Sequence, residues 1–102
     1  MKLSYAFTAI LWELPGEASW VFVTMPESDS DEILEEVPRR PGFGSVRVTA
    51  TIGAAKWSTS LFPSRELGSY ILPVKRAVRV AEGLDVGDEA HVTVEVELEG
   101  DG

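Results

Sequence analysis

Positively charged side chains are concentrated in the middle of this sequence. Positions 39 to 79 hold eight Lys and Arg residues and one acid, Glu66, which gives that stretch a net charge of +7. The rest of the chain carries −15, so the total of −8 conceals a strongly polarised distribution. Guanidinium forks bind carboxylate and phosphate groups through two parallel hydrogen bonds. We therefore expect an anion-binding surface, whose best candidates are Arg65, Lys75, Arg76 and Arg79.

One element must present these cations together if they are to act as a site. The segment 73–83 predicts a helix that Pro73 begins and Gly83 ends. Its apolar positions recur at helical spacing: Val74, Ala77, Val78 and Ala81. Their side chains are predicted to face the core, which leaves the three cations of the segment on the solvent side. Arg65 is expected close to them, one short strand earlier. The alternative, which the sequence leaves open, is that acidic strands and an acidic helix pair these charges internally.

No set of residues forms a recognisable catalytic or metal-binding motif. His91 is the only histidine, and the chain has no cysteine. The serines have no paired base nearby in the sequence, and the acids around position 88 lack the spacing of a calcium-binding loop. Asp88 is instead expected to hydrogen-bond the backbone of its own turn. We predict a protein that is not an enzyme and that holds no metal and no cofactor.

The composition is that of one globular domain covering residues 1–102, with 44% hydrophobic and 25% charged residues. A net charge of −8 argues against general affinity for nucleic acid or for anionic membranes. No segment has the length of a membrane span, and residues 3–12 do not continue as a signal peptide does, so we expect a cytoplasmic protein. Trp12, Trp20 and Trp57 are expected to fill the core, with a stacking platform as the alternative.

The pattern of apolar residues predicts six strands and two helices. The strands are expected at residues 5–14, 19–25, 45–52, 55–62, 69–72 and 90–98, and the first two are expected to form a hairpin. The helices are expected at residues 26–37 and 73–83. In the first helix, Asp29 and Glu32 have the spacing of a capping pair. The chain is therefore predicted to be mostly β.

The predicted elements follow one order twice: strand, strand, helix, strand. Pro26 and Pro73 each lie between a strand and a helix, and Gly44 and Gly87 each precede an alternating strand. We expect an internal duplication with halves 1–53 and 54–102. Two such units would close six strands into a small β-barrel, with a helix over each end and few exposed strand edges. A duplicated unit satisfies in one chain what a dimer satisfies in two, so we expect a monomer.

Residues 72–94, LPVKRAVRVAEGLDVGDEAHVTV, resemble the strand–Pro–helix–Gly-Asp–strand unit of the AbrB/MazE-like swapped-hairpin proteins. Together with WVFVTMP at 20–26 and TIGAAKWSTSL at 51–61, they also resemble a bacterial family known as a domain of unknown function (number nineteen-oh-five). Some relatives in that family are fused to a YdeI/OmpD-associated segment. The resemblance implies a double-split barrel and no particular activity.

The leading functional hypothesis is a non-catalytic binding module for a small anionic ligand or a protein partner. The alternative is a DNA-binding regulator, which rests on the likeness to swapped-hairpin proteins alone. The acidic total makes nucleic acid the weaker of the two hypotheses.

Overall fold

The computed structural model describes residues 3–16, 20–37 and 44–97 of the chain. Within them lie seven strands and two helices. In chain order these are β1 (Leu3–Ile10), β2 (Trp12–Leu14), β3 (Trp20–Thr24), α1 (Glu27–Glu36), β4 (Val46–Ile52), β5 (Ala55–Ser64), β6 (Ser69–Pro73), α2 (Arg76–Glu82) and β7 (Glu89–Val96). The prediction of a mostly β chain with two helices is confirmed.

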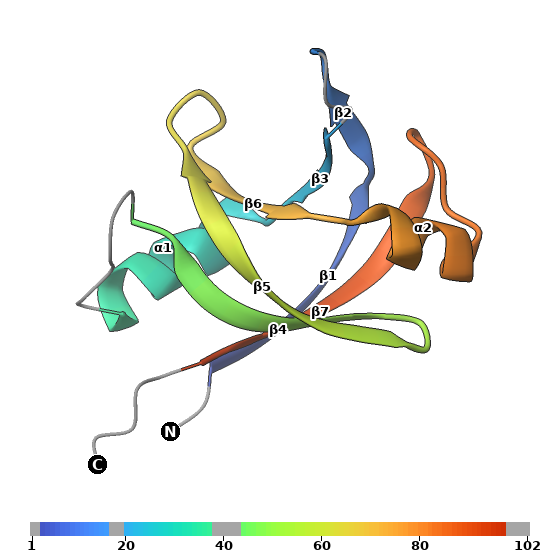
Figure 1. Cartoon of the computed structure of the whole chain (residues 1–102). Helices are drawn as coiled ribbons and strands as arrows, with labels where there is room; N and C mark the ends of the chain where they lie inside the picture. The colour runs from blue at the N-terminus through green and yellow to red at the C-terminus, as the bar shows by residue number, and fades with distance from the viewer. Residues whose placement is uncertain (1–2, 17–19, 38–43, 98–102) are drawn as a thin grey trace.

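All seven strands belong to one antiparallel sheet, in the order β1-β7-β4-β5-β6-β3-β2. The sheet curls into a half-barrel, with α1 and α2 on opposite sides of it (Figure 1). Six strands were predicted, and the difference lies at Leu11. Its N–H donates to the Asp88 carbonyl at 2.9 Å and its carbonyl accepts from the Gly87 N–H at 2.8 Å. These bonds tie Leu11 to the turn before β7, so the expected first strand is divided into β1 and β2. The predicted hairpin is present as the pairing of β2 with β3.

The strand pairings have a two-fold pattern. β3 pairs with β6 and β4 pairs with β7, which joins corresponding strands of the two predicted halves. The pairing of β1 with β7 has its counterpart in that of β5 with β4, and the pairing of β2 with β3 in that of β5 with β6. The order of strand pairing shows how the strands are arranged and does not show that one half arose from the other. The duplication into halves 1–53 and 54–102 therefore stays a prediction.

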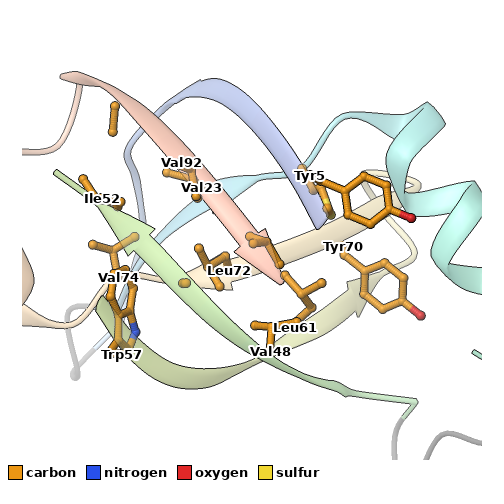
Figure 2. Packing of buried hydrophobic residues seen from close by; sticks show 14 of the residues in the cluster. Tyr5, Val23, Val48, Ile52, Trp57, Leu61, Tyr70, Leu72, Val74 and Val92 are labelled. Carbon is orange, nitrogen blue, oxygen red and sulfur yellow. The ribbon is translucent and has the colours of Figure 1, made fainter. Parts of the chain in front are cut away.

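The core lies on the concave side of the sheet, where buried side chains from several strands pack together (Figure 2). In β4 and β7 every second residue is buried, as the period of two predicts. The buried residues of those strands are Val46, Val48, Ala50, Ile52, Ala90, Val92, Val94 and Val96. Leu98, which was predicted to continue the inner face of β7, lies outside the described residues.

Helix α1 differs from the prediction at its start. Pro26 is the capping residue, and no side chain caps the helix, so the predicted pairing of Asp29 with Glu32 as a capping box is wrong. The ring of Pro26 fixes its φ close to the −57° found there, and proline has no backbone N–H that would need a partner at the helix start. Ser30 and Ile33 are the buried residues of α1, whereas Leu34 is exposed. The helix therefore rests on the sheet through one narrow stripe.

Helix α2 begins three residues later than predicted, at Arg76, because residues 69–73 continue as β6. Val78 is its buried residue, and Val74 is buried just before the helix. Ala77 and Ala81 are exposed, so their predicted place against the core is wrong. A helix of seven residues makes only two turns, and Val78 is the one position of it that is buried. Gly83 ends the helix in the left-handed conformation, at φ 65°, as predicted.

The described helices include none that is long and apolar enough to cross a membrane.

Candidate functional site

Three connections hold α2 beside β5 and β3. Val78 is buried, and the carboxylate of Glu82 accepts a hydrogen bond from the Ala54 backbone N–H in the β4–β5 turn at 3.2 Å. Before the helix, the Val74 N–H donates to the Val21 carbonyl at 2.9 Å, which extends the pairing of β6 with β3 by one step. The start of α2 is thereby fixed over one open end of the curled sheet.

A hollow of about 460 Å³ lies at that end of the sheet. We call it the α2 hollow, and it is lined by Trp20, Val21, Trp57, Ser58, Thr59, Pro73, Val74, Lys75, Arg76 and Arg79. Val21, Trp57 and Val74 are buried and form its apolar inner wall. Trp57 and Val74 lie together at one end of the buried cluster (Figure 2). The exposed residues of the lining stand at the mouth. An apolar interior with charged groups at the rim is the usual composition of a small-molecule site.

Three of the four predicted anion-binding residues line this hollow: Lys75, Arg76 and Arg79, which we call the α2 cations. Lys75 and Arg76 are exposed, and Arg79 is half-buried. The Nε of Arg79 donates to the Val74 carbonyl at 3.1 Å. This bond fixes the base of the guanidinium group and uses one of its five N–H donors, so the terminal nitrogens keep their donors.

Acidic side chains do not neutralise the α2 cations within the described part of the chain. None of the three makes an ion pair with a carboxylate there, and the bond of Arg79 to the Val74 carbonyl is the one hydrogen bond that their side chains make to described residues. Glu97, which the internal-pairing alternative would use, accepts hydrogen bonds from the hydroxyls of Thr49 and Ser58 at 3.3 Å each. The predicted internal pairing is therefore absent at these three positions among the residues described.

Arg65 is separated from the α2 cations. It lies in the turn between β5 and β6, is exposed, and does not line the hollow. Strand β6 has five residues and spans about 17 Å between that turn and α2. Figure 1 shows this turn and α2 at opposite ends of β6. Arg39 and Arg40, the first cations of the basic stretch, lie outside the described residues.

The three tryptophans have different environments. Trp57 is 8% exposed and fills the core as predicted, and Trp12 is half-buried. Trp20 is 54% exposed, so the prediction of a core position is wrong for it. Its neighbours Val21 and Val23 are buried, and alternation along β3 turns Trp20 to the other face. The sequence Trp-Val-Phe-Val is entirely apolar, so no alternation of polar and apolar residues marks the exposed face of this strand.

His91 lies on β7, and Asp88 lies in the turn just before that strand. The ring Nδ1 of His91 lies 3.1 Å from the Thr8 hydroxyl oxygen on the exposed side of β7. Asp88 accepts a hydrogen bond from the Asp85 backbone N–H at 2.8 Å, which confirms its role in the turn. Across the described ranges, no three His, Cys, Asp or Glu side chains form a group able to hold a metal ion.

Comparison with curated proteins finds no match to this chain. A family model described as "Domain of unknown function (DUF1905)" matches residues 7–94, which contain most of the sheet, both helices and the α2 hollow. This match confirms the resemblance to the domain-of-unknown-function family, and the likeness to the swapped-hairpin proteins stays a prediction. The chain therefore belongs to the DUF1905 family.

Proposed function

We propose that this chain is a non-catalytic binding module for a small anionic ligand, which it binds in the α2 hollow. The observation that carries the proposal is the meeting of the α2 cations at one opening, without a paired carboxylate in the described part of the chain. Unpaired cations gathered at one concave site attract anions, whereas scattered surface charges are screened.

The shape of the hollow supports a small ligand. Its volume of about 460 Å³ lies in the range of small-molecule sites, which is roughly 300 to 1,000 Å³. Its inner wall is apolar, and a charge pair at the edge of such a wall is stronger than one in open water. Arg79 is already fixed by its bond to Val74, so less side-chain freedom is lost when an anion binds.

The proposal includes expectations about the whole protein. We expect a cytoplasmic protein that works as a monomer. We also expect the curled sheet to close into the six-strand double-split barrel that the sequence predicts. The two edge strands of the sheet, β1 and β2, follow one another directly at Leu11, which is the connection that such a closure needs.

A thermal-shift experiment tests the proposal. The triple variant Lys75→Gln, Arg76→Gln, Arg79→Gln removes the α2 cations. A matched triple variant, Arg47→Gln, Lys56→Gln, Arg65→Gln, removes the same charge from exposed positions outside the hollow. The probes are inorganic phosphate, pyrophosphate, citrate and ribose 5-phosphate, because a ligand that binds the folded state raises its melting temperature.

We expect at least one probe to raise the melting temperature of the wild type and of the matched variant, and to leave the α2-cation variant unchanged. Equal shifts in all three proteins would contradict the hollow as the site. The DNA-binding alternative predicts a different result: a duplex oligonucleotide would bind, and its affinity would fall steeply between 50 and about 200 mM salt.

A further inference from the structure

We infer that the ligand of the α2 hollow joins a planar aromatic ring to its anionic group, and that the ring stacks on Trp20. The inference rests on the proposed function and adds a second recognition element to it. It assigns a role to the largest exposed apolar side chain of the hollow, which neither the core nor the α2 cations explain.

The exposed position of Trp20 contributes little to the stability of the fold. Its indole is 54% accessible and lines the mouth of the α2 hollow. A large ring in that position leaves apolar area in contact with water, and a bound ring would remove that area from water. Exposed aromatic faces at the edge of a charged groove are the platforms on which proteins stack bases.

The indole of Trp20 packs against a row of aromatic rings on the same strand and its neighbour. Its ring is stacked with that of Phe22, with centroids 6.2 Å apart and planes 14° apart. The ring of Phe22 in turn lies 5.2 Å from that of Trp12. Trp12 is fixed because its indole N–H donates to the Thr24 hydroxyl at 2.8 Å. This row of rings orders Trp20 before a ligand arrives, which lowers the entropic cost of binding.

The register of the sheet brings the ring and the charge together. Phe22 is paired with Pro73, and the Val74 N–H bonds to the Val21 carbonyl. Lys75 follows Val74 directly and Trp20 precedes Val21 directly, so continuing the same register would put these two residues of the hollow across from each other. Opposite residues of an antiparallel pair share a face, with Cβ atoms about 5 Å apart. A ring stacked on Trp20 therefore lies in the hollow that the three α2 cations also line.

A binding titration with three probes tests the inference. Adenosine 5′-monophosphate carries both parts of the proposed ligand, ribose 5-phosphate carries the anion alone, and adenosine carries the ring alone. The proteins are the wild type, Trp20→Ala, Trp20→Phe and the α2-cation variant. Phe62→Ala is the matched control, because Phe62 is an exposed aromatic residue outside the hollow.

We expect the monophosphate to bind the wild type at least tenfold more tightly than ribose 5-phosphate does. Trp20→Ala should remove that advantage, a loss of about tenfold or more, and leave the affinity for ribose 5-phosphate unchanged. Trp20→Phe should retain most of the advantage because it keeps a ring, and Phe62→Ala should behave as the wild type. Melting temperatures without ligand show that each variant is folded.

The other outcomes separate the two proposals. Equal affinities of the wild type for the monophosphate and ribose 5-phosphate would overturn the stacking inference and leave the anion site standing. Equal affinities for the monophosphate and adenosine, insensitive to loss of the α2 cations, would overturn the anion site and leave the stacking. Absence of binding by all three probes would overturn both.

Discussion

The hydroxyl oxygen of Ser30 accepts a hydrogen bond from the backbone N–H of Tyr70 at 3.0 Å. The two residues are 40 positions apart, and this bond joins α1 to the start of β6. Ser30 is 1% exposed and Tyr70 is 2% exposed, so the N–H is shielded from water. Ser30 therefore makes a tertiary contact between α1 and the sheet.

Replacement of this serine should destabilise the fold. Ser30→Ala leaves a buried N–H without its acceptor, which costs about 1–3 kcal/mol of the free energy of unfolding. Urea denaturation measures the loss. Ser28→Ala on the same helix is the control, because Ser28 is exposed. Equal stability of the two variants would show that the Ser30 bond contributes nothing.

Asp88 should act through its turn alone. Its carboxylate accepts from the Asp85 N–H, and the Asp88 N–H donates to the Asp85 carbonyl at 2.9 Å. Asp88→Ala should lower the free energy of unfolding by about 1 kcal/mol, with no effect on binding at the α2 hollow. Asp85→Ala keeps both of these bonds, so it serves as the control. An unchanged melting temperature of Asp88→Ala would contradict this role.

Tyr5 should make the fold sensitive to alkaline pH. Burial raises the pKa of its hydroxyl above the ordinary value of 10.0, and the carboxylate of Glu32 raises it further. The folded state thus keeps a proton that the unfolded state releases. The stability from this difference is complete below pH 10 and is lost as the pH rises above it, by up to about 1.4 kcal/mol per pH unit.

Tyr5→Phe removes this proton linkage and isolates it from the titration of the lysines. The difference in free energy of unfolding between the wild type and Tyr5→Phe should be constant from pH 7 to about 9. Above pH 10 the wild type should lose stability faster than the variant. Parallel curves up to pH 11 would show that the hydroxyl titrates equally in the folded and unfolded states.

The chain should be monomeric in solution. Light scattering is expected to give 11.1 kDa at every protein concentration tested. The exposed apolar residues Leu14, Trp20, Phe62 and Leu67 mark where self-association would begin if this expectation is wrong. A mass twice as large that does not change with dilution would contradict it.

The amino-acid sequence by itself determined the order of the elements and the inner face of the regular strands. In β4 and β7, apolar and polar residues alternate, and burial of one face follows directly from the period of two. Gly83 and Asp88 were also predictable, because a left-handed helix end and a turn hydrogen bond are local interactions.

The tertiary structure decided what local pattern leaves undetermined. Leu11 divides a strand because the turn before β7 hydrogen-bonds both of its backbone groups. Trp20 is exposed because the sheet turns its face of β3 outward, and the apolar residues around it gave the sequence no sign of which face that would be. The α2 hollow depends on the pairing of β3 with β6, which brings Lys75 and Trp20, 55 positions apart in the chain, into one lining. Register is set by contacts between distant strands, so the sequence could group Lys75, Arg76 and Arg79 on one segment but could not separate Arg65 from them.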